Sequence, residues 1–258
     1  MKIACVQMDI SYGNPEINFA KVEKSIREAA NHQADVVVLP EMWNTGYALD
    51  RLAELADHEG KRTKALLSEL ARELHIYIVG GSVSTKKGEH FFNTMYVADR
   101  SGRLIAEYDK VHLFKLMDEH HFLHAGQAKN TFEIDGITCG GVICYDLRFP
   151  EWTRAHVLEG AKVLFIPAEW PAQRIDHWQL LLQARAIENQ CFIVAVNRVG
   201  EDPNNHFNGH SMVIAPWGDL LLSGNTQAGI DYAELDLKEL NRVRKTIPIF
   251  RDRRTDLY

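Results

Sequence analysis

Residues 137–150 read ITCGGVICYDLRFP, and the change of character within them decides the fold. The first seven residues are mostly apolar, which is typical of a buried strand. The apolar pattern stops at Cys144, and a polar turn then leads to Pro150, a residue type that favours the first position of a helix. The stretch therefore predicts a strand, a turn and a helix over 150–159, which is the opening unit of an α/β fold.

The alternation continues towards the C-terminus. We expect a strand over 162–167 (KVLFIP), a helix over 176–189, a strand over 192–197 (FIVAVN) and a hairpin over 209–224 that turns at Trp217 and Gly218.

The first half of the chain repeats this order. We expect strands over 3–9 (IACVQMD), 34–39 (within the apolar run ADVVVLP) and 76–81. Helices are expected over 15–31 and 61–74, and a hairpin over 92–110 that turns at Ser101 and Gly102. Alternating strands and helices imply largely parallel pairing within each half. Two such halves can pack sheet on sheet with their helices outside. We therefore predict an α/β fold, a four-layer α-β-β-α sandwich of two β-α-β-α-β halves with pseudo-two-fold symmetry.

The chain shows no composition shift or linker that would divide it. We predict one domain over 1–258, in which 225–258 is a C-terminal tail with a short strand over 230–236. The rest of the tail is expected to be irregular and holds the apolar residues Ile247 to Phe250. Exposed apolar tails often dock on a partner subunit, so we expect this one at a subunit interface.

Composition limits the class of protein. The chain has 258 residues, 46% of them hydrophobic, and a net charge of −6, which argues against nucleic acid as the main partner. No apolar run approaches the ~20 residues that span a bilayer. Residues 1–6 read as a strand followed at once by polar residues, so we expect no signal peptide, no membrane partner and a cytoplasmic location. None of the four cysteines has CxxC spacing, which disfavours a zinc knuckle.

Cys144 is the cysteine that the pattern sets apart. Cys5, Cys139 and Cys191 lie within apolar strand patterns and are interpreted as buried structural thiols. Cys144 instead ends a strand and precedes a turn into a helix. Backbone N–H groups at such a place stabilise a thiolate and a nearby oxyanion, so Cys144 is a candidate nucleophile.

Glu41 and Lys110 are the candidates that accompany it, because functional groups of α/β sheets gather beyond the carboxyl ends of strands. Glu41 follows the buried run VVVLP and precedes an aromatic loop that would exclude water, so it is a candidate base. Alone it reads equally well as a surface carboxylate. Lys110 ends the first hairpin. Beside a nucleophile it would stabilise the thiolate and an oxyanion, whereas alone it reads as a solvated lysine.

Four histidines lie close together in the sequence: His112, His120, His121 and His124. His120 and His124 have the i, i+4 spacing of metal ligands on a helix, but no full HExxH is present. Loop packing is the better interpretation. We expect no metal and no organic cofactor.

Three motifs match one family in order and spacing: Pro40-Glu41, Tyr108-Asp109-Lys110, and the stretch 144–151 (CYDLRFPE). On these motifs the chain resembles the nitrilase superfamily of carbon–nitrogen hydrolases over roughly residues 3–250. Further matches lie at 80–82, 184–189 and 197–200. Residues 112–120 and 168–171 (AEWP) are most similar to the ω-amidase branch, which includes amidases associated with methionine salvage in bacilli.

The resemblance implies a catalytic triad of Glu41, Lys110 and Cys144, with a second glutamate, Glu119, near it and the Tyr145 backbone N–H as a further oxyanion donor. It also implies the four-layer sandwich and a homodimer or higher homo-oligomer. Four aromatic residues sit just past strand ends and are expected near Cys144: Trp43, Tyr47, Tyr145 and Trp170. The candidate cations for a substrate carboxylate are Arg148, Arg174, Arg198 and Lys115, and Arg148 is taken as the substrate-binding residue.

On these grounds we expect the protein to hydrolyse the carboxamide of a small 2-oxo acid. The reaction would pass through a cysteine thioester and give a carboxylate and ammonia. A nitrile or N-carbamoyl hydrolase would use the same triad. A non-catalytic binding protein on the same fold is a further alternative, and it would have an inactive site. A hydrolase with a Cys–His pair is another, and it would need a histidine base. The expected partner is a small-molecule amide and not a nucleic acid.

Overall fold

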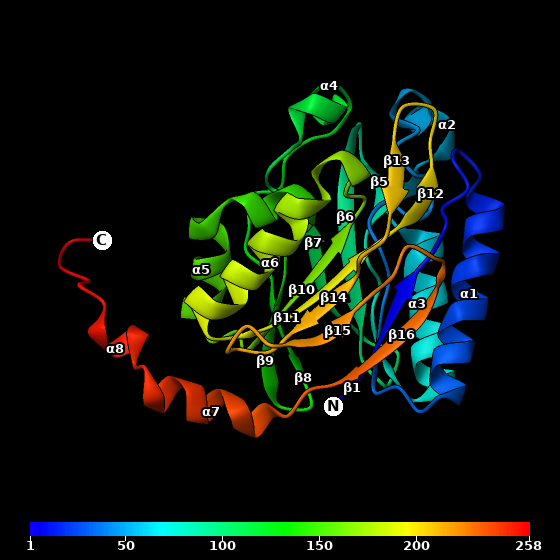
Figure 1. Cartoon of the computed structure of the whole chain (residues 1–258). Coiled ribbons are helices and arrows are strands. Elements are labelled where there is room, and N and C mark those ends of the chain that lie inside the picture. The colour runs from blue at the N-terminus through cyan, green and yellow to red at the C-terminus, as the bar shows by residue number, and fades with distance from the viewer.

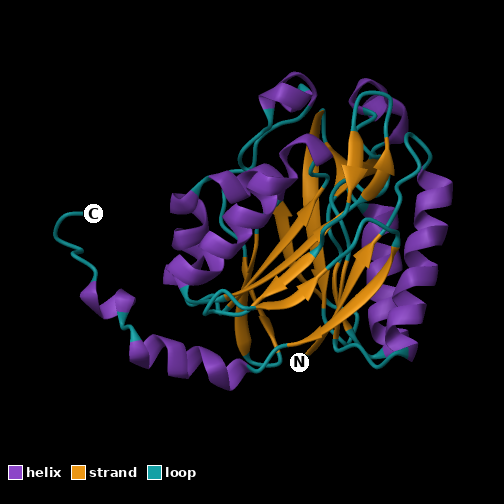
Figure 2. Ribbon diagram, viewed as in Figure 1, coloured by secondary structure: helices purple, strands orange, loops and turns teal.

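The computed structural model describes all residues from Met1 to Tyr258. Two β-sheets lie face to face between two layers of helices (Figures 1 and 2). Helices α1 (Pro15–Asn31) and α3 (Lys61–Leu74) cover the first sheet, and α5 (Pro150–Leu158) and α6 (Ile175–Asn189) cover the second. The expected four-layer sandwich is confirmed.

The first sheet has eight strands in the order β16-β1-β2-β4-β6-β5-β3, and β7 pairs with β6. Its strands are β1 (Lys2–Gln7), β2 (Val36–Val38), β3 (Asp57–His58), β4 (Tyr77–Val79), β5 (Val83–Lys87), β6 (His90–Ala98), β7 (Leu104–Asp109) and β16 (Gly229–Glu234). Strands β1, β2 and β4 are parallel, and β6 joins β4 antiparallel.

The second sheet has six strands in the order β15-β14-β11-β10-β9-β8. They are β8 (Thr131–Ile134), β9 (Ile137–Gly141), β10 (Val163–Ala168), β11 (Phe192–Asn197), β14 (Met212–Ile214) and β15 (Leu220–Ser223). Strands β9, β10 and β11 are parallel, and β14 joins β11 antiparallel, as β6 joins β4 in the first sheet. This shared order confirms the repeat expected from the sequence. A separate ribbon pairs β12 (Val199–Glu201) with β13 (His206–Asn208).

Strand β1 shows how one segment serves two layers. Side chains alternate between the faces of a strand, so Ile3 and Cys5 enter the core between the sheets while Ala4 and Val6 join the core beneath α1 and α3. All four are buried. A strand buried on both faces explains why the central strands appear in the sequence as continuous apolar runs.

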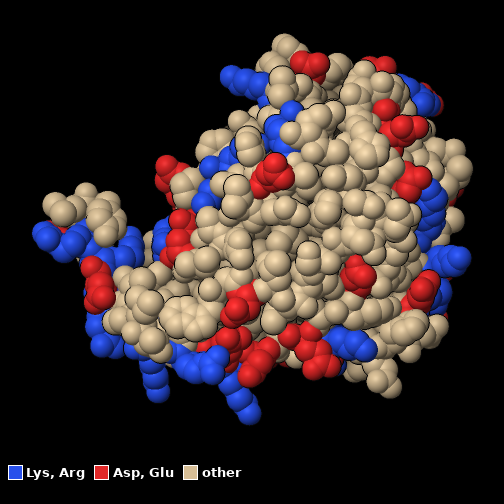
Figure 3. Space-filling model, in the orientation of Figure 1, with Lys and Arg blue, Asp and Glu red and all other residues tan.

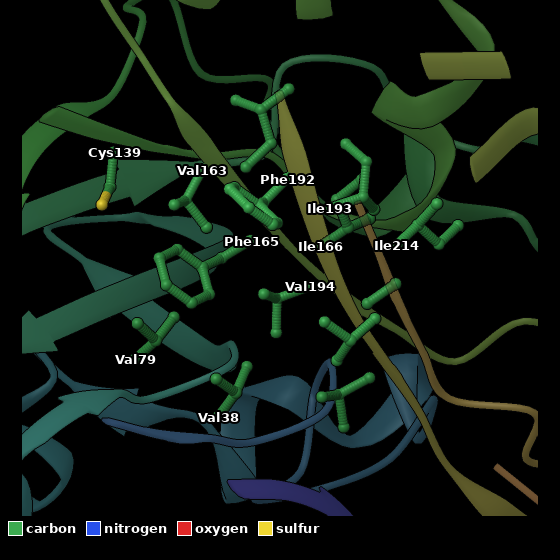
Figure 4. Packing of buried hydrophobic residues seen from close by; sticks show 14 of the residues in the cluster. Val38, Val79, Cys139, Val163, Phe165, Ile166, Phe192, Ile193, Val194 and Ile214 are labelled. Carbon is green, nitrogen blue, oxygen red and sulfur yellow. The ribbon is translucent and has the colours of Figure 1, made fainter. Parts of the chain in front are cut away.

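The core between the sheets joins the two halves of the chain. Figure 4 shows Val38 and Val79 of the first sheet facing Phe165 and Val194 of the second, and all belong to one cluster of 40 buried residues. The halves therefore share one continuous hydrophobic core, which fixes the strand ends of one sheet against those of the other.

The C-terminal tail differs from the expectation. After β16 it forms two helices, α7 (Leu237–Thr246) and α8 (Ile249–Asp252), which lead away from the body of the molecule (Figure 1). The expected irregular tail is therefore wrong. The Asp236 side chain caps α7 by accepting from the Lys238 N–H, and Glu239 follows three residues after Asp236, a pattern that marks a helix start.

The remaining helical segments are short and lie in the loops: η1 (Leu49–Arg51), α2 (Leu52–Leu55), η2 (Lys115–Met117), α4 (Glu119–Phe122), η3 (Cys144–Arg148) and η4 (Ala172–Arg174). None of the helices has both the length and the apolar character that crossing a bilayer requires.

Candidate active site

Cys144 lies three residues beyond β9 and opens the 3-10 helix η3. Its backbone has φ +43°, in the left-handed region, which costs a non-glycine residue roughly 1–2 kcal/mol. Its side chain is buried. The first N–H groups of a helix lack intrahelical partners, so this turn supplies donors next to the sulfur, as the sequence predicted.

Glu41 lies just beyond β2 and is fully buried. Its carboxylate accepts hydrogen bonds from three groups, Lys110 Nζ, Asn93 Nδ2 and the Glu169 backbone N–H, each at 2.8 Å, and the Tyr47 hydroxyl oxygen lies 3.0 Å from its Oε1. These donors come from both sheets, so the carboxylate is held where the two sheets meet.

Lys110 lies just beyond β7 and bridges two buried carboxylates. Besides its bond to Glu41, its ammonium donates to Glu119 Oε1 at 2.6 Å. The other oxygen of Glu119 accepts from the Phe114 N–H at 2.7 Å, and the Tyr47 hydroxyl donates to Glu119 Oε1. The structure therefore brings together Glu41, Lys110 and Glu119 as the sequence analysis expected.

The electrostatics of this cluster define its chemistry. Burial alone would lower the pKa of Lys110, but the Glu119 and Glu41 carboxylates raise it well above its usual value, so the ammonium keeps its proton. Burial raises the pKa of the Cys144 thiol well above its usual value, and the negative charge of Glu41 adds to the rise. A neutral thiol, a carboxylate and a fixed cation thus lie together.

A narrow pocket opens beside Cys144. Its other lining residues are Phe114, Tyr145, Arg148, Glu169, Trp170, Pro171 and Arg174. The Arg148 guanidinium lies over the Trp170 ring at 4.7 Å, and that of Arg174 lies 5.5 Å from the Phe114 ring. Three of the expected substrate contacts, Tyr145, Arg148 and Trp170, therefore border the nucleophile.

Trp43 does not reach this pocket, contrary to expectation. Its indole N–H donates to the Gly80 carbonyl at 2.7 Å, and its ring packs edge-on against Phe19 of α1 at 4.8 Å. The loop turns at Met42, whose φ is +45°, and the next side chain joins the outer core beneath α1. Tyr47, from the same loop, does lie in the site, where it binds the two carboxylates.

The four candidate cations have different surroundings. Arg198 is fully buried and bonded to Glu169 Oε2 at 2.9 Å and to the Ile10 carbonyl at 2.9 Å. Lys115 is exposed and outside the pocket lining. Arg148 and Arg174 line the pocket, and neither forms an ion pair with a carboxylate. They are the two cations available to a bound anion.

The histidines stay apart from the nucleophile. The His124 ring lies 4.0 Å from that of His90, and the His120 ring lies 3.8 Å from that of His121. The charged groups that act on Cys144 are Glu41, Lys110 and Glu119, with no histidine among them. No histidine is among the residues that line the pocket beside Cys144.

Sequence reasoning did not single out three residues of the site: Asn93, Phe114 and the backbone of Glu169. Asn93 had a signal, because it is a polar residue inside the apolar strand β6 and is buried there. Glu169 had one too, since it follows a fully buried strand run. Phe114 lies in a loop whose path only the folded chain defines.

Comparisons with known proteins agree with this geometry. The family model described as carbon-nitrogen hydrolase matches residues 2–245. The 2-oxoglutaramate amidase of Bacillus subtilis is 53% identical over 256 residues, covering 99% of this chain and 98% of the relative. An omega-amidase of Homo sapiens is 34% identical over 270 residues, covering 100% of this chain and 96% of the relative.

A solved structure gives the same result at the level of the fold. The protein XC1258 of Xanthomonas campestris, a CN-hydrolase superfamily member with an arsenic adduct in its active site, superimposes with a TM-score of 0.92 at 31% identity. The match covers 99% of this chain and 97% of the other.

Proposed function

Because the chain belongs to the carbon–nitrogen hydrolase family and is therefore a hydrolase of C–N bonds, we propose that it hydrolyses the terminal carboxamide of a small 2-oxo acid to a carboxylate and ammonia. The names of its relatives point to 2-oxoglutaramate as the substrate to test first. The observation that carries the proposal is a buried thiol, carboxylate and ammonium beside a pocket with two unpaired arginines.

Acylation begins at Cys144. Glu41 takes the thiol proton as the sulfur attacks the amide carbon, and the Lys110 ammonium and the Tyr145 N–H stabilise the oxyanion. Such a donor contributes about 3 kcal/mol to the transition state. Collapse of the intermediate breaks the C–N bond, and Glu41 returns its proton to the departing nitrogen. Ammonia leaves, and a thioester on Cys144 remains.

Deacylation uses the same base. Glu41 takes a proton from a water molecule, whose oxygen attacks the thioester carbon. The second intermediate breaks the C–S bond, the sulfur recovers its proton and the carboxylate product leaves. One amide and one water thus give one carboxylate and one ammonium ion, because the proton of the new carboxyl group passes to the released ammonia. No step needs a metal or an organic cofactor.

Glu119 and Tyr47 serve as positioning groups in this scheme. Glu119 holds the Lys110 ammonium at 2.6 Å, and the Tyr47 hydroxyl binds the carboxylates of Glu41 and Glu119. Since the lysine has carboxylates on two sides, it cannot swing away when the charge on the substrate changes. The oxyanion therefore meets a donor that is already in place.

Arg148 and Arg174 would bind the carboxylate of the substrate. Both line the pocket and lack an acidic partner, and a guanidinium can bind a carboxylate through two parallel hydrogen bonds. Tyr145 and Trp170 form the walls, which favours a short, planar substrate.

The proposal includes one domain over 1–258 whose tail meets a second copy of the chain. Leu158 of α5 and Leu180 and Ile187 of α6 are exposed apolar side chains, and Ile247 in the tail is 47% exposed. Figure 3 shows lysines and arginines gathered along α7 and α8, while the centre of that face carries few charged side chains. A homodimer would cover these apolar groups. The four unpaired cysteines fit a cytoplasmic protein.

An assay of ammonia release from 2-oxoglutaramate tests this function. Cys144→Ala should lower kcat by at least about 1000-fold, because the covalent step is lost. Cys191→Ala is the matched control, since this buried cysteine lies outside the site, and it should keep its activity. Parallel arms with a nitrile, an N-carbamoyl compound and a neutral amide test specificity. Ammonia release retained by Cys144→Ala would refute the mechanism, and preference for a nitrile would refute the substrate class.

A further inference from the structure

A further buried carboxylate, that of Asp146, lies beside the nucleophile and has no part in the reaction steps above. Asp146 is fully buried in η3, two residues after Cys144. Its two oxygens accept four hydrogen bonds: from the Ile143 N–H at 2.9 Å, the Tyr108 hydroxyl at 2.6 Å, the His112 N–H at 2.9 Å and His112 Nδ1 at 2.7 Å. In return the Asp146 N–H donates to the Ile143 carbonyl at 2.9 Å.

The origin of these donors gives the carboxylate a particular place. Ile143 immediately precedes Cys144 in the second half of the chain. Tyr108 and His112 stand two residues before and two residues after Lys110, in the first half. Asp146 therefore connects the residues on both sides of Lys110, through the Tyr108 hydroxyl and through His112, to the backbone at Cys144, across the boundary between the two halves.

We propose that Asp146 is a positioning residue that fixes the Cys144 sulfur relative to the Lys110 ammonium. This inference rests on the proposed function, in which these two groups share one oxyanion. Cys144 needs such a restraint, because its φ of +43° is unfavourable for a non-glycine residue and would relax if the turn were free. A displacement of about 1 Å at a reacting group can lower a rate about 100-fold.

A carboxylate is the group that suits this position. All four partners of Asp146 donate, and an ionised carboxylate only accepts. An asparagine has nearly the same shape, but its NH₂ group would face donors. Asp146→Asn should therefore loosen the link between the two segments without creating a cavity.

The test compares three variants of the full-length protein. Asp146→Asn removes the acceptor. His112→Phe removes one donor while an aromatic ring still stacks on Phe149, which lies 3.7 Å from the His112 ring. Asp109→Asn is the matched control, because Asp109 adjoins Lys110 but binds Lys87 and Thr94 and makes no contact with the Cys144 turn. Each variant is measured for Tm, kcat, KM and the pH profile of Cys144 alkylation by iodoacetamide, with the site identified by peptide mass spectrometry.

The expected result is a split between stability and reactivity. In Asp146→Asn, kcat should fall at least about 10-fold with KM nearly unchanged, and the alkylation profile should shift along the pH axis, because the sulfur no longer lies at its place beside Lys110. His112→Phe should change kcat and the alkylation profile in the same direction, but by a smaller amount. Asp109→Asn should match the parent.

Two outcomes would overturn the inference. One is a folded Asp146→Asn whose kcat and alkylation profile match the parent. The other, should Asp146→Asn not fold, is a folded His112→Phe with parental kcat and profile. Alkylation needs no substrate, so the positioning role is tested even if the parent fails to hydrolyse 2-oxoglutaramate, which would refute the proposed function alone.

Discussion

At the scale of single residues, the site depends on one cation between two carboxylates. Lys110, Glu41 and Glu119 are all fully buried, and each charge is compensated only by the others. Removing one member of such a group leaves an unpaired charge away from water, which is strongly destabilising. The residues that perform the chemistry therefore also contribute to the stability of the fold.

Lys110→Arg tests whether charge alone is sufficient. The variant keeps a cation, but the planar guanidinium cannot place one compact donor at 2.8 Å from Glu41 and 2.6 Å from Glu119. We expect kcat to fall by about 100-fold or more, with a smaller change in KM. Glu41→Gln should be similarly inactive, and the double variant should lose little more than either single one, as for groups that act as a unit. Additive losses would contradict the scheme.

Glu169 offers a test of pH dependence. Burial raises its pKa to about 8, and Arg198 opposes that rise. The folded protein then binds this proton more tightly than the unfolded chain does, so the stability contributed is full at low pH and is lost as pH rises through about 8.

In Glu169→Gln the side chain is an amide, which does not gain or lose a proton in this pH range. The Tm of the variant relative to the parent should therefore increase by about 3 °C or more between about pH 5 and about pH 9. The exposed Glu69, replaced in the same way, is the control and should show no trend. A Tm difference that is constant or falls with pH would contradict the prediction.

The sequence predicted some residues of the site and not others for a physical reason. Glu41, Lys110 and Cys144 each stand beyond a strand end, and sheet topology brings such positions together. Trp43 was misplaced because a turn at one residue, Met42, sends its side chain to the other face. Sequence spacing predicts which end of a sheet a residue occupies, but a single backbone angle decides the direction of its side chain.

At the scale of elements, one turn supports the loop that carries Glu41. Gly81 has φ +57°, and a Cβ there would overlap the Pro40 carbonyl oxygen. The next residue, Ser82, donates its N–H to that same oxygen and accepts from the Met42 N–H through its hydroxyl. The turn after β4 therefore holds both sides of Glu41.

Gly81→Ala should disturb this contact. The added methyl group must push the turn away from Pro40, and we expect a fall in Tm together with loss of most activity. Gly88→Ala is a closely matched control, because Gly88 also has φ +57° but no atom lies within 4 Å of the point that its methyl carbon would occupy. It should lose only about 1–2 kcal/mol of stability and keep its kcat. Equal effects in the two variants would show that backbone strain, and not the close approach, is responsible.

Helices were easier to predict than strands. The bounds of α1 and α3 agree with the sequence to the residue, because amphipathic spacing and terminal residues mark both ends. Strand β2 is shorter than its apolar run, since the run continues into buried loop residues such as Leu39, whereas β11 matches its predicted range of 192–197. Helix α7 was missed because its apolar residues are few, although its capping residue is recognisable in the sequence.

At the scale of the whole molecule, the tail is the part with the least contact to the body. Helices α7 and α8 lead outward in Figure 1, and Phe250 is held between Arg154 at 5.4 Å and Arg244 at 4.9 Å. The exposed side chains beyond it, Leu257 and Tyr258, are 69% and 72% accessible in the single chain. A second copy of the chain would give these groups a surface to pack on.

Deleting residues 247–258 tests that role. We expect the sedimentation coefficient to change from that of a dimer or larger assembly towards that of a monomer, because apolar contacts of the tail are lost. The parent protein at the same concentrations is the reference. An assembly of the same size in the truncated protein would show that the tail does not hold the subunits together.

The reacting groups come from both halves of the chain: Glu41 and Lys110 precede the segment 124–130, and Cys144 follows it. Neither half alone carries a complete set. If the polypeptide were divided in that segment, each fragment alone would be inactive, and turnover would begin only when the two sheets packed together again. The fold is thus a natural starting point for a split enzyme, in which released ammonia reports that two fused partners have come together.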